Sequence, residues 1–244
     1  DHFHAVARRN LHLTGELRRA VKLFEQHEIS AIPWKGPTLA TSVYGNLALR
    51  QFNDLDILVR RRDALHAKDL LVACGYRPQF NLTRAQEAAY LQSVSAHLLV
   101  SADGAAIIEL HWEILPRRYS LALDLERLWE RSVPASLAGA STLALAPEDL
   151  LLTLCVHGAT HCWQRLAWLC DIAELIRSYQ QMDWGRVMEQ ARASGSARML
   201  ALGLFRCDAA ATAAGVAELL VLEVADAEAL VADLVRHGLL QQCV

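Results

Sequence analysis

The spacing of apolar residues changes near residue 140, and this change is the feature that most constrains the fold. Up to about residue 135, short extended runs alternate with segments of helical spacing. After Pro147 almost every segment has helical spacing, and the composition shifts to Ala and Leu with few β-branched residues. The sequence therefore predicts an α/β (α+β) domain over residues 1–139, which includes an N-terminal helix, and a helical domain over residues 140–244.

Turn and cap residues indicate where the elements of the first part begin and end. Pro37 suits the first position of a helix, Asp63 is a natural N-cap, and Gly75 is a natural helix end. The pair Asp103-Gly104 is typical of a tight turn between two strands. The expected helices cover residues 5–28, 37–44, 64–74 and 85–92, and the expected strands cover residues 29–34, 54–59, 97–101 and 106–115.

The composition excludes several classes of protein. The 244 residues are 53% hydrophobic and 21% charged, which excludes intrinsic disorder. The net charge of −3 provides no general basic field, so no long nucleic acid is expected as a partner. No apolar run approaches the roughly 20 residues of a membrane helix, so no membrane partner is expected. The six cysteines contain no CxxC pair, which favours reduced thiols and a cytoplasmic protein.

The sharpest chemical feature is the pair Asp54 and Asp56 in an otherwise apolar run. Alternate side chains of a strand share a face, so both carboxylates are expected to point the same way. Such a pair needs a cation or strong hydrogen bonds, and carboxylate oxygens suit Mg²⁺ or Mn²⁺. From the pair alone, two solvated aspartates at an exposed strand end are the commoner arrangement. Without metal the two charges repel, so replacing Asp56 with Asn is expected to raise thermal stability.

Two neighbouring features favour a nucleotide site. Lys35 and Gly36 form a turn between an expected strand and an expected helix, whose N-terminus suits a phosphate group. Glu109 lies in another expected strand and supplies a third acid, and His111, two residues further on, shares its face. One strand with two acids, a second strand with another acid, and a glycine turn before a helix form a recognisable set.

This set resembles the polymerase-beta-like nucleotidyltransferases, and most closely a branch labelled an uncharacterised nucleotidyltransferase family. The resemblance covers about residues 29 to 210 and depends on the order and spacing of short motifs. It implies a polymerase-beta-like domain with a small mixed sheet, followed by a helical domain that closes over the nucleotide. The motifs are Trp34-Lys35-Gly36, Leu39-Ala40, Tyr44, Arg50, Asp54-Leu55-Asp56-Ile57-Leu58-Val59, Cys74-Gly75-Tyr76, Glu109-Leu110-His111-Trp112, Val156-His157-Gly158 and Leu169-Cys170-Asp171-Ile172-Ala173.

The resemblance implies a metal-dependent enzyme. It would move a nucleoside monophosphate from a nucleoside triphosphate, with ATP as the expected donor, to an acceptor hydroxyl. Asp54, Asp56 and Glu109 would be the catalytic residues and would hold Mg²⁺ or Mn²⁺. Two such ions about 3.5–4 Å apart can activate the attacking oxygen and stabilise the leaving pyrophosphate. The acceptor stays open among a small molecule, a peptide and a protein.

The same resemblance implies nucleotide-binding residues in the first part. Lys35 and the amides after Gly36 would hold the phosphates, with Lys35 outside the carboxylate cluster, and Arg50 would neutralise developing charge. This chain has Lys-Gly-Pro where the wider superfamily has Gly-Ser, so Thr38 is the candidate for the missing hydroxyl. His111 either contacts phosphate or acceptor, or caps the exposed end of its strand.

His157 and Asp171 are expected to line the nucleotide site from the helical part, although a purely structural role stays open for each. His157 and His161 have the helical spacing of a zinc pair but lack the acid of an HExxH motif, and local hydrogen bonds would satisfy them equally well. Asp171 could instead form a structural pair with His or Arg. The alternative function for the whole chain is a non-catalytic nucleotide- or peptide-binding module that keeps the fold. A histidine-based metal hydrolase is disfavoured.

Overall fold

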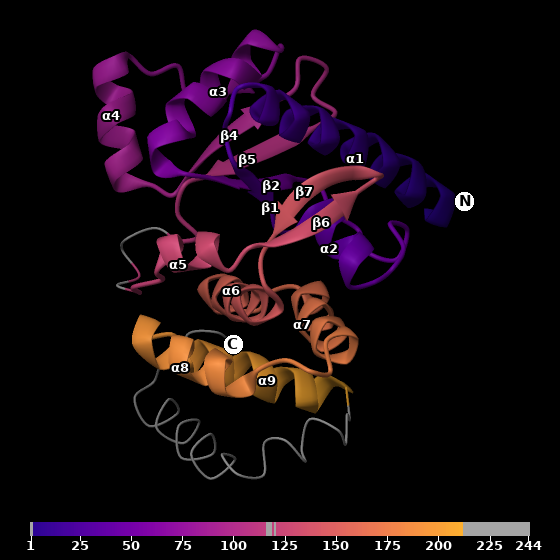
Figure 1. The fold of residues 1–244 in the computed structure, drawn as a ribbon. Coiled ribbons are helices and arrows are strands. Elements are labelled where there is room, and N and C mark those ends of the chain that lie inside the picture. Colours follow the sequence, from indigo (N-terminus) through magenta and orange to yellow (C-terminus); the bar gives the residue numbers. More distant parts are fainter. Residues whose placement is uncertain (1, 116–118, 120, 212–244) are drawn as a thin grey trace. The chain divides into compact units, whose positions relative to one another are not determined.

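The structure is a computed structural model that describes residues 2–115, 119 and 121–211. Its backbone divides into two compact units, residues 1–146 and residues 147–244. The strands of the described residues all belong to the first unit, and the described part of the second unit is helical (Figure 1). The expected boundary at residues 139 and 140 falls at the turn of a hairpin that the first unit contains.

The first unit contains a long N-terminal helix, short helices and seven strands among its described residues. In chain order its elements are α1 (His2–Gln26), β1 (Ala31–Pro33), α2 (Gly36–Ser42), β2 (Leu55–Val59), the 3-10 turn η1 (Arg61–Asp63), α3 (Ala64–Ala73), β3 (Arg77–Pro78), α4 (Arg84–Ser93), β4 (Ala96–Val100), β5 (Ile107–His111), α5 (Leu125–Glu130), β6 (Val133–Leu137) and β7 (Ala140–Ala144).

A five-stranded mixed sheet forms the centre of this unit, with strand order β1-β2-β5-β4-β3. Strands β2 and β5 are parallel, and the other neighbouring pairs are antiparallel. The small mixed sheet is confirmed, and the strands expected near residues 29–34, 54–59 and 106–115 lie side by side in it. Each observed strand is shorter than the expected run, and Asp54 lies just before β2 instead of on it.

One face of the sheet packs on α1 and α3 to form the hydrophobic core. The core includes Leu13 and Leu17 from α1, Leu71 from α3, and Leu55 and Ile57 from β2. Because side chains alternate along a strand, the residue between these last two points away from the core helices. The acid-bearing face of the sheet is therefore the face opposite α1 and α3.

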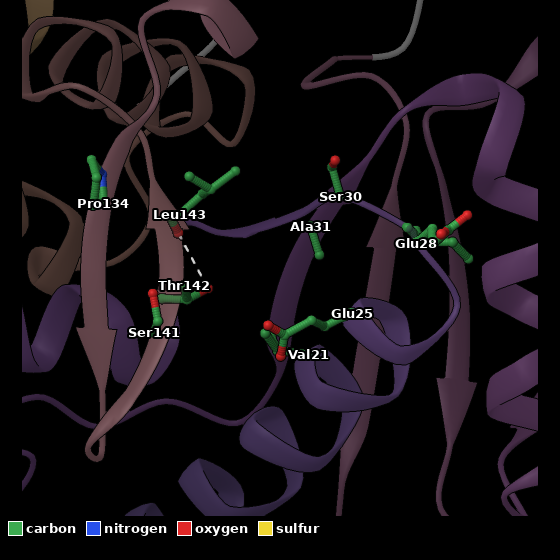
Figure 2. Close-up of a pocket in the computed structure, with 10 residues that line it drawn as sticks. Val21, Glu25, Glu28, Ser30, Ala31, Pro134, Ser141, Thr142 and Leu143 are labelled. Carbon is green, nitrogen blue, oxygen red and sulfur yellow. Dashed lines mark hydrogen bonds between the residues drawn. The ribbon is translucent and has the colours of Figure 1, made fainter.

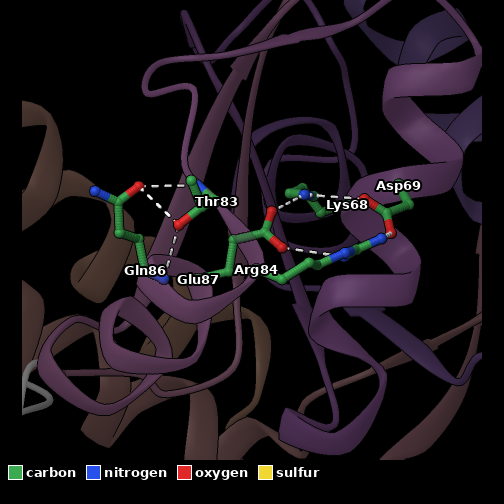
Figure 3. Close-up of polar contacts among 6 residues, drawn as sticks. All are labelled: Lys68, Asp69, Thr83, Arg84, Gln86 and Glu87. Carbon is green, nitrogen blue, oxygen red and sulfur yellow. Dashed lines mark hydrogen bonds and ion pairs between the residues drawn. The ribbon is translucent and has the colours of Figure 1, made fainter.

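An ion-pair network with a buried centre at Lys68 and Glu87 joins α3 to α4 (Figure 3). Lys68 on α3 donates to the carboxylate of Glu87 on α4, and both side chains are nearly inaccessible to solvent. Arg84 bridges Glu87 and Asp69, with nitrogen–oxygen distances of 3.0 Å and 2.8 Å. A capping box at residues 83–86 begins α4 next to this network.

Three elements of the first unit have no clear signal in the sequence: β3, α5 and the hairpin β6–β7. The strand β6 contains Pro134 and Ser136 and is largely exposed, so it lacks the apolar alternation of a half-buried strand. The hairpin turns at Ala138 and Gly139, which have positive φ angles of 48° and 78°. A non-glycine residue rarely adopts that conformation, so residue type gave little indication of the turn.

The described part of the second unit consists of α6 (Pro147–Thr160), α7 (Leu166–Ser178), α8 (Trp184–Ser194) and α9 (Ala197–Ala211). Trp163, in the turn after α6, has a φ angle of +54° and a buried side chain. Its indole packs onto Gly158 of α6 and Gly203 of α9, where a Cβ atom would overlap or crowd the ring. No helix among the described residues is long and apolar enough to cross a membrane.

Candidate functional site

The register of β2 and β5 brings an acidic cluster together on the face opposite the core helices. Asp56 is the direct partner of Glu109, and Leu58 is the partner of His111. Glu109 and His111 are two residues apart on β5, so they share a face. Ligand atoms of Asp56, Glu109 and His111 all lie within 4.8 Å of one another, and this is the only such group of metal-ligating side chains among the described residues.

Asp56 is the most buried member of the cluster, with a side chain only 1% exposed. Its Oδ1 accepts from Lys35 Nζ at 2.7 Å and lies 3.2 Å from His111 Nε2. Its Oδ2 is buried and has no hydrogen-bond partner among the described residues. Burial alone would raise the pKa of Asp56, but the ammonium of Lys35 and the hydrogen bond from His111 outweigh it and hold the pKa well below its usual range. Asp56 is therefore an ionised carboxylate whose Oδ2 atom can accept a further ligand.

His111 joins the two acids. Its Nε2 lies 3.4 Å from Glu109 Oε2 as well as 3.2 Å from Asp56 Oδ1, and its ring meets Trp34 edge-on with centroids 5.8 Å apart. Burial lowers the pKa of His111, but the hydrogen bonds to Asp56 and Glu109 outweigh this effect, and the pKa is raised. Position on the strand predicted that His111 shares a face with Glu109, but it gave no indication of the contact with Asp56.

Lys35 lies inside the carboxylate cluster, so the expectation that it lies outside is wrong. The backbone N–H of Trp34 donates to the carbonyl of Asp56 at 3.3 Å, which extends the pairing of β1 and β2 by one residue. Lys35 follows at the N-cap of α2, and its ammonium lies 4.4 Å from the centroid of the Trp34 ring as well as against Asp56. The side chain is only 11% exposed. Lys35 is a fixed counter-ion of Asp56 in this structure.

Gly36 allows the turn after Lys35 to pack closely against the backbone that leads into β2. Its φ angle is +54°, and a Cβ atom there would lie 3.3 Å from the backbone oxygen of Asp54. A side chain would therefore be strained at Gly36 and would press against the segment that leads into β2. Thr38 follows on α2 and is buried, with an Oγ1 atom that has no hydrogen-bond partner among the described residues.

Asp54 is adjacent to the cluster without belonging to its tightest part. It is half-buried directly before β2 and is not in the group whose ligand atoms lie within 4.8 Å of one another. Burial, followed by repulsion from Asp56, raises the pKa of Asp54, and Lys35 opposes this shift. Arg50 lies in the loop before β2, and its backbone oxygen accepts from Asn10 Nδ2 at 2.9 Å. The assigned role of Arg50 in charge neutralisation stays a prediction.

The two expected site residues of the second unit lie on different helices. His157 is on α6, with its ring 4.7 Å from His161 and 5.2 Å from Trp168, measured between centroids. Asp171 is on α7 and is fully buried. The described residues place no third metal-ligating side chain with the two histidines. The assignment of His157 and Asp171 to a nucleotide site stays a prediction.

A hollow of about 400 Å³ lies elsewhere in the first unit (Figure 2). It is bordered by the end of α1, the start of β1 and the strand β7, with Glu25, Ser30 and Thr142 among its lining residues. None of the acidic cluster lines it. The candidate site therefore consists of the polar side chains around Asp56, and this hollow is not part of it.

Solved structures of one antibiotic-resistance factor are similar to this chain. The solution structure of ANT(2'')-Ia has a TM-score of 0.53 and 11% sequence identity, over 79% of this chain and 96% of that chain. The crystal structure of ANT(2'')-Ia in complex with adenylyl-2''-tobramycin has a TM-score of 0.51 and 10% identity, over 75% of this chain and 97% of that chain. At such low identity the similarity shows the fold alone. No curated protein matches this chain.

A protein-family model matches most of the chain. The model is described as Uncharacterised nucleotidyltransferase, and it matches residues 1–211. The matched segment includes the whole five-stranded sheet, the acidic cluster and the described helices of the second unit. The chain therefore belongs to the uncharacterised nucleotidyltransferase family and is a nucleotidyltransferase of the polymerase-beta-like fold.

Proposed function

We propose that this chain transfers a nucleoside monophosphate from ATP to a hydroxyl of a small-molecule acceptor, in a reaction that requires Mg²⁺ or Mn²⁺. The observation that carries the proposal is the cluster of Asp56, Glu109 and His111, set by the parallel pairing of β2 and β5. An ionised, buried carboxylate with an unpartnered oxygen is costly unless a ligand uses it. A nucleotidyltransferase supplies such a ligand in its divalent cation.

The residues present fit a hard divalent cation. Asp56 offers its free Oδ2, and Glu109, whose side chain is 34% exposed, offers a carboxylate that solvent and substrate can reach. Asp54 is the proposed third carboxylate, because its pKa is sensitive to both of these acids. A cation bound by these residues supplies Lewis-acid activation of the acceptor oxygen and the phosphoryl group.

The other side chains of the cluster position the acids and the nucleotide. His111 contacts both carboxylates, so it fixes the orientation of each. Lys35 and Thr38 are proposed to bind phosphate oxygens, Lys35 through its ammonium and Thr38 through its unpartnered hydroxyl. Gly36, which has no side chain, is proposed to let the backbone between them come close to the phosphate. Glu109 is the proposed acceptor of the proton that leaves the attacking hydroxyl, since it is the more accessible acid of the pair.

The remaining assignments are part of the same proposal. Arg50 is proposed to neutralise charge on the leaving pyrophosphate, and His157 and Asp171 are proposed to contact the nucleotide from the second unit. A small-molecule acceptor is supported by the structure of ANT(2'')-Ia with adenylyl-2''-tobramycin, in which a protein of the same fold holds an adenylylated small molecule. A peptide or protein acceptor is the alternative outcome. A cytoplasmic location stays a prediction from cysteine usage.

Two measurements test the proposal. The purified full chain is incubated with [α-³²P]ATP, Mg²⁺ and a panel of hydroxyl-bearing small molecules, peptides and proteins, and labelled products and pyrophosphate are measured. We expect labelled product and pyrophosphate in equal amounts, and only when Mg²⁺ or Mn²⁺ is present. Label on peptides or proteins alone would contradict the proposed acceptor class. Metal-dependent ATP binding without pyrophosphate release across the panel would instead favour the non-catalytic binding module.

A further inference from the structure

The contacts of Asp56 divide its two oxygens into different environments. Oδ1 already contacts two donors, Lys35 Nζ at 2.7 Å and His111 Nε2 at 3.2 Å. Oδ2 contacts no donor among the described residues. A carboxylate can bridge two cations by giving one oxygen to each, as the carboxylate ligands of two-metal sites do. In this structure an ammonium takes the oxygen that the second cation would use.

Lys35 is held in this position by more than the ion pair. Its side chain is only 11% exposed, and its ammonium lies 4.4 Å from the centre of the Trp34 ring. The backbone around it is also constrained, because Trp34 pairs with Asp56 and Gly36 has a positive φ angle. Surface lysines are usually mobile and paired weakly. Lys35 instead has three independent restraints at the cluster.

Positive charge is already present where a second cation would bind. Lys35 Nζ lies 2.7 Å from Asp56 Oδ1, and the tight cluster offers one further carboxylate, Glu109, which His111 Nε2 also contacts at 3.4 Å. A second divalent cation on the Oδ1 side would add two positive charges beside this buried ammonium, and it would depend on the phosphates of the nucleotide to offset them.

We infer that Lys35 takes the place of one of the two cations, so that the site binds a single divalent ion on the Oδ2 side of Asp56. This inference rests on the proposed function and specifies the composition of its site. It also accounts for the Lys-Gly-Pro sequence at the turn, because the residue before the glycine is the one that reaches Asp56. Lys35 then neutralises Asp56 and, under the proposed function, also contacts the triphosphate.

Counting bound Mn²⁺ tests the inference directly. The full chain is dialysed to equilibrium against Mn²⁺ and saturating α,β-methylene ATP, which cannot transfer its nucleotide. The excess of Mn²⁺ on the protein side is then counted per chain, so that Mn²⁺ held by free nucleotide on both sides cancels. We expect one bound ion per chain for the wild type and for Lys35→Arg, which keeps the positive charge. We expect two for Lys35→Met, which keeps the length of the side chain and removes the charge. Lys22→Met, on an exposed lysine of α1, is the matched control and should bind one ion.

Each outcome separates the inference from the proposed function. Two ions bound to the wild type would overturn the inference and leave a metal-dependent transferase intact. One ion in both the wild type and Lys35→Met would also overturn it, because removing the charge would then not open a second position. No bound Mn²⁺ in the wild type would overturn the proposed metal-dependent function itself. If Lys35→Met is unfolded by circular dichroism, Lys35→Gln replaces it, and the wild-type count still decides between one ion and two.

Discussion

Asp56 lies directly opposite Glu109 on neighbouring parallel strands, and a single imidazole nitrogen of His111 contacts both carboxylates. The pairing of β2 and β5 therefore sets the distance between the acids, while His111 sets their orientation. The acid on β2 is almost fully buried and the acid on β5 is partly open. This difference suits one carboxylate to hold a cation and the other to meet substrate.

Replacing Asp56 with Asn should abolish metal-dependent nucleotide binding and should also lower thermal stability. This predicted loss is opposite to the expectation from the sequence, in which relief of repulsion from Asp54 raises thermal stability. In the structure Asp56 is the counter-ion of Lys35, so Asp56→Asn leaves a buried ammonium without its charge partner. Breaking a buried ion pair from one side costs about 3–5 kcal/mol, which outweighs the relieved repulsion.

The measurement is the melting temperature of the wild type and Asp56→Asn, with and without Mg²⁺ and ATP. The wild type should show an increase when both ligands are present, because they bind only the native state. The variant should melt lower and show no such increase. Asp63→Asn is the control, because the side chain of Asp63 makes no capping hydrogen bond. A melting temperature of Asp56→Asn above that of the wild type would restore the repulsion argument.

Apolar alternation predicted the separate strands, because it depends on local sequence. The order of strands is a tertiary property, and the neighbouring positions of Asp56 and Glu109 were expected from the resemblance to the nucleotidyltransferases. Neither source predicted the pair between Lys35 and Asp56. That pair depends on a turn conformation at Gly36 and on one additional backbone pairing at Trp34, and neither follows from apolar spacing. The turn signal at Gly36 was visible, but the direction of the preceding side chain was not.

The hairpin β6–β7 also escaped prediction, for a different reason. Strand β6 is mostly exposed, β7 is mostly half-buried, and both are built largely of small or polar residues, so no buried face imposes a period of two. The hairpin's contacts with β1 come from the tertiary structure of the first unit. The same holds for the Trp163 turn, where two successive residues with positive φ angles, Cys162 and Trp163, are stabilised by packing and not by residue preference.

Gly158→Ala should destabilise the second unit. A Cβ atom at Gly158 overlaps the buried indole of Trp163, which also contacts Gly203 and therefore has little room to move. Overpacking of this kind costs about 1–3 kcal/mol. Gly15→Ala on α1 is the control, because no atom lies within 4 Å of its Cβ position and alanine favours a helix over glycine by about 1 kcal/mol.

The two alanine variants should therefore change stability in opposite directions. Guanidinium denaturation followed by circular dichroism gives the free energy of unfolding for each, with near-ultraviolet signals reporting on tryptophan packing. Gly158→Ala should lower the unfolding free energy and weaken the tryptophan signal, whereas Gly15→Ala should raise or preserve it. Equal unfolding free energies of Gly158→Ala and the wild type would show that the Trp163 indole does not pack against Gly158.

Protonation of His97 should lower the free energy of unfolding of the first unit below neutral pH. The His97 ring stacks on Tyr90 at a centroid distance of 4.8 Å and meets Trp112 edge-on at 5.1 Å. Burial, followed by the charge of Lys68, lowers the pKa of His97, while Glu87 and Asp69 oppose the shift. The unfolded chain therefore binds a proton more readily than the folded one as pH falls below about 6.5. Its contribution to stability is complete above that pH and is lost as pH falls through the lowered pKa.

The test is the pH dependence of the unfolding free energy between pH 7.5 and 5 for the wild type and His97→Gln. One proton changes the slope by at most about 1.4 kcal/mol per pH unit, and the variant should lack this component. His66→Gln, which removes a histidine at an exposed position on α3, is the matched control for the substitution itself. Identical slopes for the wild type and His97→Gln would contradict a lowered pKa at this residue.

Replacing one member of the Lys68–Glu87 ion pair should lower the free energy of unfolding more than replacing both. Lys68→Met leaves the Glu87 carboxylate, only 6% exposed, with Arg84 as its remaining charged partner, and Arg84 is 71% exposed. Glu87→Leu leaves the Lys68 ammonium, 10% exposed, with Asp69. Each single change should cost about 3–5 kcal/mol, because a buried charge loses its closest partner.

The double variant removes both charges and should be more stable than either single variant. Arg84→Met should cost much less than either of these single changes, since exposed pairs contribute little. Urea denaturation of the four variants and the wild type measures the coupling free energy, and a double variant whose loss equals the sum of the single losses would show that the two charges do not depend on each other.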